Sequence, residues 1–424
     1  MFTTQKGVMI ILDGLGDRGI PAFGGKTPLE VAETRNMDRL ASAGQCGLVD
    51  PLFPGMPVGT HTGICLLFGL SKQHTMKLVR GPIEASGVGL NNNDQALYFR
   101  CNFATLKKDE DHYDILDRRA GRINTGTESL AATIGRVDLG DGITASLHPA
   151  TQHRVVLQLE GSGLSHDISN TDPGNLYKTK GLLSCVPNDP SDRAAVRTSN
   201  AVNRLIEIIH EKLSQHPVNR QRIDNNLPPA NGIICRGPGK LPKVKPLLNQ
   251  LKMKTAVISG EKTVLGLGAL LGYDLFMNDK FTAAHDTDLN AKVRTTIQAL
   301  DDHDMVYLHI KATDIYSHDL DPTGKREMLL KIDDAIAPLI TDSLVIAITA
   351  DHSTDTNTGR HTGDPIPSLI YNPRGRVDGC MEFSELACNS GGLGRINSSG
   401  FLLSMLDQMN QLENFRPKDS VFVL

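Results

Sequence analysis

Four continuous apolar runs constrain the fold of this chain more than any other feature. They are GVMIILDG (7–14), TAVISG (255–260), MVYLHIKATD (305–314) and LVIAITADH (344–352). Strands of a parallel sheet that is covered on both faces read as unbroken apolar runs of this kind. Segments with helical spacing occur at 26–44, where Thr27 and Glu30 form a capping-box pattern, and at 323–340. This pattern predicts an α/β core with a mostly parallel sheet flanked by helices.

The middle of the chain has a different character. Between residues 73 and 230 the strand signals become short and alternating, as in QALYFRCNFATL and HRVVLQL, and turn-rich stretches interrupt them. We therefore expect a core domain made of residues 1–72 and 231–424, with a smaller α+β domain, residues 73–230, inserted into it.

Composition excludes several classes of protein. The net charge of −4 gives no general basic field for nucleic acid or an anionic membrane, and 4% aromatic residues do not suit a ring-stacking platform. No apolar run approaches about 18 residues, and the first run meets Asp13 too early for a signal peptide. Seven cysteines without a C-x-x-C pair indicate reduced thiols. We expect a cytoplasmic protein without nucleic-acid or membrane partners. The sequence does not decide whether the chain forms a homo-oligomer.

Acidic and imidazole side chains follow three of the four apolar runs. In an open α/β sheet, ligands bind beyond the carboxyl ends of the strands, so these side chains should converge. The six candidates are Asp13, Asp314, His318, Asp351, His352 and His361. A mixed oxygen and nitrogen set suits Mn²⁺ or Zn²⁺ better than Ca²⁺. Each residue alone has an ordinary explanation, such as a helix cap, but the six together do not.

Two metal ions about 3.5–4 Å apart can bridge a phosphoryl oxygen and activate a nucleophile. The sequence therefore predicts a two-metal site for phosphoryl transfer. Asp319, Asp321 and Asp355 lie close by in the sequence and could support the ligands through hydrogen bonds.

Several longer motifs carry a family resemblance. They are ILDGLGD, GKTPLEVAETRNMDRLASAG, FRCNFAT, DRRAGR, HPVNRQR, PPANGIICRGPG, HIKATDIYSHD, TADHST and RHTGDPIP. They resemble the archaeal type of cofactor-independent (2,3-bisphosphoglycerate-independent) phosphoglycerate mutase, a family of the alkaline phosphatase superfamily. The resemblance runs nearly from end to end. It implies an alkaline-phosphatase-like core with an inserted substrate-binding lid, and an isomerase of glycolysis and gluconeogenesis that interconverts 3-phosphoglycerate and 2-phosphoglycerate through a phosphoenzyme.

The resemblance also implies how the ligands are divided. Asp314, His318 and His361 match the residues that hold one ion in the family. Asp13, Asp351 and His352 match those that hold the other, together with the nucleophile. We expect two divalent ions, Mn²⁺ or Zn²⁺ before Mg²⁺ or Co²⁺.

The stretch GMPVGTHTG (55–63) departs from the family pattern. Where the family has Ser in a sequence like PGSDTAH, this chain has Thr60, followed by His61 in place of an Asp. A metal-bound Thr hydroxyl can attack phosphorus as a Ser hydroxyl does, so Thr60 is the predicted nucleophile and a metal ligand. His61 either makes the local charge less negative or faces solvent. The change leaves two alternatives open: a phosphohydrolase or phosphonate-processing relative with the same metals, and a catalytically silent binding protein.

Several residues in or next to the middle domain, most of them arginines, are candidates for substrate binding, because guanidinium groups bind carboxylate and phosphate in a bidentate manner. The candidates are Asp117, Arg118, Arg119, Arg122, His153, Arg154, Arg220 and Arg236, with Lys311 on a metal-bearing strand. Scattered arginines are usually solvated, but a phosphorylated carboxylic acid needs several cations. A lid that closes would keep water from the phosphoenzyme. The sequence does not identify the general base that deprotonates the glycerate hydroxyl. The candidates are His61, Lys311 and Asp117.

Overall fold

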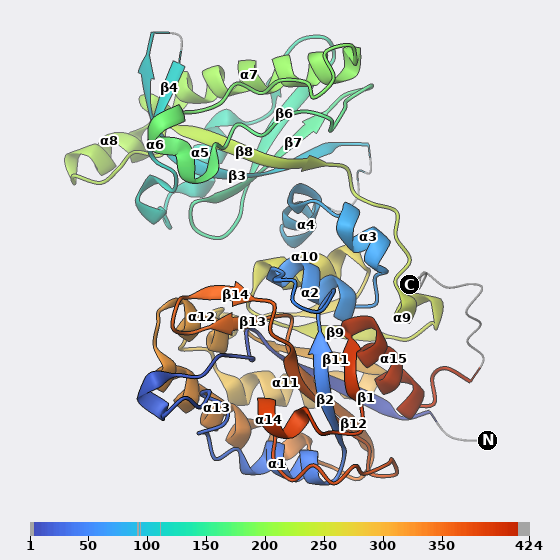
Figure 1. The fold of residues 1–424 in the computed structure, drawn as a ribbon. Helices are drawn as coiled ribbons and strands as arrows, with labels where there is room; N and C mark the ends of the chain where they lie inside the picture. Colours follow the sequence, from blue (N-terminus) through green and yellow to red (C-terminus); the bar gives the residue numbers. More distant parts are fainter. Residues whose placement is uncertain (1–3, 91–92, 94, 111, 414–424) are drawn as a thin grey trace. The chain divides into compact units, whose positions relative to one another are not determined.

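The computed structural model describes residues 4–90, 93, 95–110 and 112–413. It divides into two units, with unit 2 (Leu78–Lys243) inserted in the sequence between the two segments of unit 1, Met1–Lys77 and Val244–Leu424 (Figure 1). The second boundary lies later than the predicted one at 230/231. The reason is strand β8 (Gly232–Gly239), which pairs with β3 (Leu97–Asp109) and so belongs to unit 2.

Unit 1 contains an eight-stranded sheet with the order β10-β9-β11-β1-β12-β15-β2-β16. The strands are β1 (Lys6–Leu12), β2 (Gln45–Asp50), β9 (Thr255–Ile258), β10 (Asp274–Phe276), β11 (Met305–Ile310), β12 (Leu344–Thr349), β15 (Ile366–Tyr371) and β16 (Gly394–Asn397). The four apolar runs form β9, β11, β1 and β12, which are neighbours and run parallel, as predicted. Every residue of β11 and β12 is buried.

Helices surround this sheet (Figure 1). They are α1 (Arg35–Ser42), α2 (Thr60–Leu67), α3 (Lys72–Lys77), α9 (Leu247–Gln250), α10 (Lys262–Leu270), α11 (Leu289–Asp302), α12 (Ala312–His318), α13 (Pro322–Ile336), α14 (Glu385–Cys388) and α15 (Ser398–Gln408), with 3-10 turns at η1 (Pro21–Phe23) and η4 (Ala337–Leu339) and a hairpin of β13 (Ser353–Asp355) and β14 (Arg360–Thr362). Of these helices, α1, α10, α11, α14 and α15 pack directly against the strands of the sheet. The helix predicted at 323–340 is confirmed as α13 and η4.

Two predicted elements were wrong in extent. The strand predicted at 305–314 ends at Ile310, because Lys311 takes a helical backbone conformation and Asp314 lies in the first turn of α12. Of the helix predicted at 26–44, only Arg35–Ser42 is a regular helix. The capping-box hydrogen bonds between Thr27 and Glu30 do form, at 2.8 and 3.1 Å, but they close a separate turn.

The start of α1 is set by a tertiary contact. The carboxylate of Asp333, on α13, accepts hydrogen bonds from the main-chain N–H groups of Asn36 and Met37 at 3.0 and 2.7 Å. These are donors that a helix leaves unpaired in its first turn. A partner about 300 residues away in the sequence therefore decides where this helix begins, and a local pattern cannot show it.

Unit 2 is an antiparallel sheet with helices, which confirms the α+β prediction. Its strands are β3, β4 (His112–Asp117), β5 (Val137–Asp138), β6 (Thr144–Pro149), β7 (Arg154–Glu160) and β8, and its helices are α4 (Arg80–Gly87), α5 (Thr127–Ile134), α6 (Tyr177–Lys180), α7 (Arg193–Ser214) and α8 (Pro217–Asp224), with 3-10 turns at η2 (Ala120–Arg122) and η3 (Gly174–Leu176). The prediction of short strands fails for β3, which has 13 residues, and the 22-residue α7 was not predicted.

The two faces of β3 have different chemistry. Leu97, Phe99, Cys101 and Phe103 lie in a hydrophobic core that also contains apolar residues of α5 and α7. Tyr98, Arg100 and Asn102 alternate with them and therefore face the opposite side of the sheet. Arg154 of β7 pairs with Asn102 and Arg236 of β8 pairs with Arg100, so these arginines lie on the same face.

Two further expectations concern the whole chain. All seven cysteines are free thiols and buried. Among the described residues, no helix combines the length and apolar character that crossing a bilayer requires.

Candidate active site

The carboxyl ends of β1, β11 and β12 meet at one edge of the unit 1 sheet. In the register of these parallel strands, Leu12 lies beside Ile310 and Ile11 beside Thr349. The residues that follow the strands therefore converge, as the sequence predicted. Three carboxylates and one imidazole at this edge are fully buried, namely Asp13, Asp314, Asp351 and His352.

One group of ligand atoms consists of Asp13, Asp351 and His352. The Nε2 atom of His352 lies 3.3 Å from Oδ1 of Asp13 and 3.2 Å from Oδ2 of Asp351. This is the grouping that the resemblance implies for one metal ion.

A second group consists of Asp314, His352 and His361. The β13–β14 hairpin brings His361 back to this edge, opposite Thr354. His318 is close as well, because its Nε2 lies 3.3 Å from both Oδ2 of Asp314 and Nε2 of His361. The structure thus assembles the three predicted residues, and it adds His352, which stands between the two groups.

Main-chain carbonyls fix the tautomers of the two outer histidines. Nδ1 of His318 lies 2.8 Å from the carbonyl oxygen of Gly359, and Nδ1 of His361 lies 2.9 Å from that of Val58. Since a carbonyl only accepts, each Nδ1 carries the proton and each Nε2 keeps a lone pair when the ring is neutral. Such contacts orient imidazoles for metal binding.

Thr60 is the first residue of α2, not part of a free loop. Its Oγ1 lies 3.3 Å from Nε2 of His352 and 3.3 Å from Nζ of Lys311. Gly63, in the next turn, packs against the main chain of Asp351 so closely that a side chain would overlap it. Gly63, the last residue of GMPVGTHTG, therefore lets α2 approach the edge of the sheet that carries the ligands, and this places the Thr60 hydroxyl there.

Lys311 lies among the carboxylates of this edge. Its Nζ donates to Asp13 at 3.0 Å and to Asp314 at 2.6 Å. Burial lowers the pKa of Lys311, but Asp13, Asp314 and Asp351 raise it by more, so it lies above its ordinary value. The ammonium group held in this way donates to Oγ1 of Thr60 at 3.3 Å.

The charges of this edge call for further cations. Burial raises the pKa of Asp13, yet Lys311, His309 and His352 together keep it well below its ordinary value. Burial and the neighbouring Asp13 raise the pKa of Asp351 to about 6. The Oδ2 atom of Asp351 is buried and, among the described residues, accepts no hydrogen bond. Three buried carboxylates thus face Lys311 and His352, and the pKa of His352 is about 9 because Asp351 and Asp13 raise it by more than burial lowers it. The set of oxygen and nitrogen donors fits divalent ions.

Some residues near the site have other partners than predicted. Asp321 caps α13 by accepting from Gly324, Asp355 accepts from Asn357 and Thr358, and Asp319 lies 3.6 Å from His285. Half-buried His61 contacts Thr62, with 3.2 Å between Nε2 and Oγ1.

The polar face of the unit 2 sheet carries a cluster of arginines around two buried acids. Glu84 lies 3.0 Å from Nε of Arg100 and 3.5 Å from Nη1 of Arg154. Asp172 accepts two hydrogen bonds from Arg118, at 2.7 and 2.8 Å, and lies 3.4 Å from Arg236. We call Arg80, Arg100, Arg118, Arg154 and Arg236 the arginine cluster, since all five lie near one another or share these acids.

The arginine cluster has an excess of positive charge, five arginines against two acids. Burial, offset in part by Glu84, lowers the pKa of Arg100 to about 9, and the neighbouring arginines add to this effect. Nη1 of Arg100 and Nε of Arg118 are buried without a hydrogen-bond partner among the described residues. Buried donors of this kind are normally paired, so the cluster is suited to bind an anion.

The other predicted residues of unit 2 divide into near and remote ones. Burial and Arg154 lower the pKa of His153 to about 4, and Arg119 and Asp117 are also close to it. Asp117 accepts from the main chain of Arg119 at 2.7 Å and so shapes the turn. Arg122 and Arg220 are exposed, Arg220 donates to Gln215, and no described contact joins either to the cluster.

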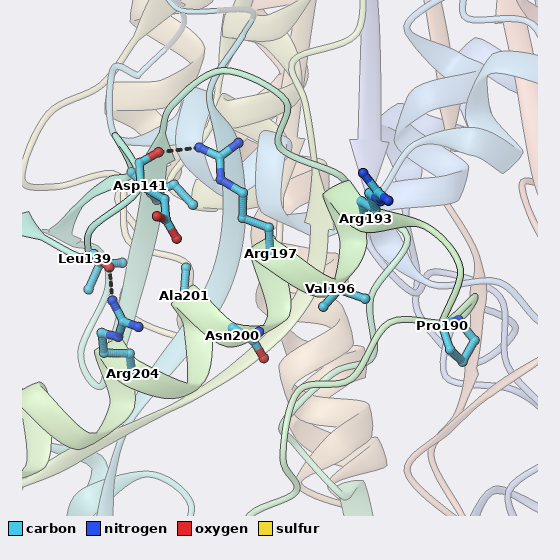
Figure 2. Close-up of a pocket in the computed structure, with 10 residues that line it drawn as sticks. Leu139, Asp141, Pro190, Arg193, Val196, Arg197, Asn200, Ala201 and Arg204 are labelled. Carbon is cyan, nitrogen blue, oxygen red and sulfur yellow. Dashed lines mark hydrogen bonds between the residues drawn. The ribbon is translucent and has the colours of Figure 1, made fainter.

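A hollow of about 530 Å³ lies elsewhere on unit 2, along α7 (Figure 2). Arg197 donates to the carbonyl oxygens of Ser162 and Asp141 at 2.7 and 2.6 Å, and Arg204 donates to that of Leu139. These guanidinium groups fasten the turn at 139–143 to the helix. They therefore have a structural explanation and are separate from the arginine cluster.

Sequence reasoning missed His309, Arg80, Arg100, Glu84, Asp172 and Thr354, whose hydroxyl donates to Oδ1 of Asp314 at 2.8 Å. A signal existed for Arg100, because FRCNFAT alternates polar and apolar residues and so places it on the face opposite the core. His309 looked like part of a buried strand, and its contact with Asp13, 3.0 Å from Nε2 to Oδ2, appears only in the tertiary structure.

Comparison with known proteins agrees with this geometry. The model of the Metalloenzyme superfamily matches residues 5–408. A 2,3-bisphosphoglycerate-independent phosphoglycerate mutase of Methanopyrus kandleri is 38% identical over 419 residues, which cover 97% of this chain and 98% of that protein. The corresponding protein of Thermococcus kodakarensis is 37% identical over 416 residues, covering 97% and 99%. This chain belongs to the family of 2,3-bisphosphoglycerate-independent phosphoglycerate mutases.

Solved structures of similar proteins share the fold of this phosphoglycerate mutase family member. The cofactor-independent phosphoglycerate mutase of Thermoplasma acidophilum is 32% identical, with a TM-score of 0.71 and coverage of 96% of this chain and 100% of that one. A protein of Pyrococcus horikoshii is 31% identical, with a TM-score of 0.82 and coverage of 98% and 100%. Membership of a metalloenzyme superfamily and the two ligand groups together support divalent metal binding.

Proposed function

We propose that this chain interconverts 3-phosphoglycerate and 2-phosphoglycerate through a phosphothreonine at Thr60. The observation that carries the proposal is the Thr60 hydroxyl, 3.3 Å from His352 Nε2 and 3.3 Å from Lys311 Nζ, where two groups of ligand atoms meet. The named activity of the relatives supports the same reaction. An enzyme that stores the phosphoryl group on its own hydroxyl needs no bisphosphoglycerate.

The metal-binding roles follow the two groups. Asp13, Asp351 and His352, with Thr60, would hold one divalent ion, and Asp314, His318 and His361 the other. Bound there, such ions would lower the pKa of the Thr60 hydroxyl and offset the charge of the phosphoryl oxygens. We propose Mn²⁺ or Zn²⁺, because carboxylate and imidazole donors are mixed.

The chain's own residues account for the chemistry of the first step. The Oγ1 of Thr60 loses its proton and attacks phosphorus in line, so that the Oγ1–phosphorus bond forms as the bond from phosphorus to O3 breaks. The departing O3 takes up a proton and becomes a hydroxyl of glycerate. The ammonium of Lys311, which already contacts Oγ1, offsets the added negative charge. The N-terminus of α2 has the same effect, because a phosphoryl group on its first residue meets the positive end of the helix dipole. In the second step O2 of glycerate attacks phosphothreonine and frees Thr60.

The arginine cluster of unit 2 is proposed to hold the substrate acid. Its unpaired donors on Arg100 and Arg118 suit a carboxylate, and Arg154 and Arg236 add charge. Among the predicted residues His153, Arg119 and Asp117 adjoin this cluster. We do not extend the proposal to Arg122 or Arg220.

The test is an assay with 3-phosphoglycerate and Mn²⁺, coupled to enolase so that 2-phosphoglycerate is detected, with free phosphate measured in parallel. We expect 2-phosphoglycerate without stoichiometric phosphate release. Free phosphate alone would instead identify a phosphohydrolase. Intact-protein mass spectrometry after brief incubation, followed by peptide mapping, should find the phosphoryl group on Thr60. Phosphate on Thr62 or His61 would contradict the assignment.

A further inference from the structure

His309 is a fully buried imidazole to which the roles above give no task. It lies in β11, beside Ile11 of β1. Its Nε2 is 3.0 Å from Oδ2 of Asp13, and its Nδ1 is 3.1 Å from Oγ of Ser259, just after β9. The ring is therefore held at both nitrogens, between the middle of the sheet and a metal-site carboxylate.

The direction of these hydrogen bonds can be assigned. The carboxylate of Asp13 can only accept, so Nε2 of His309 carries a proton and donates to Oδ2. In the neutral ring Nδ1 is then an acceptor, and it receives the hydroxyl proton of Ser259, whose Oγ accepts the main-chain N–H of Glu261 at 3.0 Å. Lys292 donates to the carbonyl oxygen of His309 at 2.9 Å and fixes the main chain as well.

We propose that His309 is a positioning residue for metal binding, which holds Oδ2 of Asp13 so that Oδ1 faces the site. Nε2 of His352 lies 3.3 Å from Oδ1, whereas Nζ of Lys311 lies 3.0 Å from both carboxylate oxygens of Asp13. A carboxylate free to turn about its own axis would present either oxygen, and His309 removes that freedom in advance. The inference rests on the proposed metal site and adds to it a group that is not itself a ligand.

Three substitutions separate this role from plain structural support. His309→Leu removes the hydrogen bond and keeps an apolar side chain, while His309→Gln keeps an amide donor that can reach Asp13. The matched control is His303→Leu. His303 is also buried, its Nε2 lies 2.9 Å from a carboxylate oxygen of Asp274, and its Nδ1 lies 2.7 Å from the carbonyl of Ala299. It precedes β11 at the end opposite to the site.

The experiment is calorimetric titration of the full-length, metal-free protein with Mn²⁺, with thermal unfolding of each metal-free variant measured beside it. Loss of such a supporting hydrogen bond weakens metal binding by about 10–100-fold, so we expect a loss of this size for His309→Leu. His309→Gln should recover most of the affinity, and His303→Leu should bind as the wild type does, even where its unfolding temperature falls.

Wild-type affinity in folded His309→Leu would overturn the inference, and so would an equal loss in His303→Leu or no recovery in His309→Gln. If His309→Leu does not fold, Ser259→Ala is measured instead, since it removes the hydroxyl that orients the ring without touching Asp13. An unchanged affinity in that variant would also overturn it. Absence of Mn²⁺ binding by the wild type is a different result, because it contradicts the proposed metal site itself.

Discussion

Gly63 of α2 packs directly against the main-chain carbonyl of Asp351, and a methyl group on Gly63 would overlap that oxygen. The contact joins the helix that carries Thr60 to the segment that carries Asp351 and His352. It fixes the distance between the hydroxyl and the ligand atoms without any side chain.

Gly63→Ala should therefore displace α2 and lower kcat, by about 100-fold if the hydroxyl moves by about 1 Å. The control is Gly400→Ala in α15, where an added methyl would make only ordinary contacts, at 3.4 Å or more. It should leave the activity unchanged, because alanine is the better helix residue. Steady-state kinetics of both variants decide this, and wild-type kcat in Gly63→Ala would refute the packing argument.

Thr60→Ala should lower kcat by more than about 10³-fold, because the covalent intermediate needs the hydroxyl. Thr60→Ser should retain activity and carry the phosphoryl group on the new serine. Mass spectrometry after incubation with 3-phosphoglycerate measures both. A phosphorylated Thr60→Ala variant would show that another residue is the nucleophile.

Removal of divalent metal with a chelator should abolish activity, and Mn²⁺ should restore it. Asp351→Asn should need at least about 10-fold more Mn²⁺ for half-maximal activity, since an amide oxygen is a weaker ligand than a carboxylate. Asp319→Asn, whose carboxylate pairs with His285 outside the ligand groups, is the matched control. Full activity of the stripped wild type would contradict the whole mechanism.

Arg100→Gln should raise KM for 3-phosphoglycerate by about 10-fold or more, because a charge-assisted hydrogen bond contributes about 1.5–3 kcal/mol. The control is Arg136→Gln. Arg136 also lies in unit 2 and pairs with a glutamate, Glu160, at 3.1 Å, but it is exposed and outside the arginine cluster. An equal KM in the two variants, both with wild-type unfolding temperatures, would exclude the cluster from substrate binding.

Stability should depend on Glu385 between about pH 4.5 and 7. Burial raises the pKa of Glu385 to about 7, although Thr27 donates to it at 2.8 Å. The folded state therefore binds a proton more tightly than the unfolded state, so the free energy of unfolding falls as pH rises through this range. Glu385→Gln should remove this dependence. The unfolding temperature of the variant minus that of the wild type should therefore be larger at pH 8 than at pH 5. If this difference in unfolding temperature is the same at pH 5 and pH 8, Glu385 does not titrate in this way.

The sequence by itself determined the core of the fold and the composition of the ligand edge. Short unbroken apolar runs between helical segments are typical of parallel strands buried on both faces, and such strands end at a common edge, so Asp13, Asp351 and His352 were expected to converge. Each strand and the acidic or imidazole residues that follow it can be recognised from a short segment of the chain, although the segments themselves are far apart in the sequence. The family motifs carried the rest, including the role proposed for Thr60.

Only the tertiary structure decided which side chains complete the site. His352 stands between both ligand groups, Lys311 reaches Thr60, and His309 contacts Asp13 across neighbouring strands. The arginine cluster likewise depends on Glu84 and Asp172, while Arg122 and Arg220 lie outside it although they sit in matching motifs. A local sequence pattern shows which types of side chain are present. The direction in which each side chain points, and the residue that it contacts, depend on the strand register and on helices from distant parts of the chain.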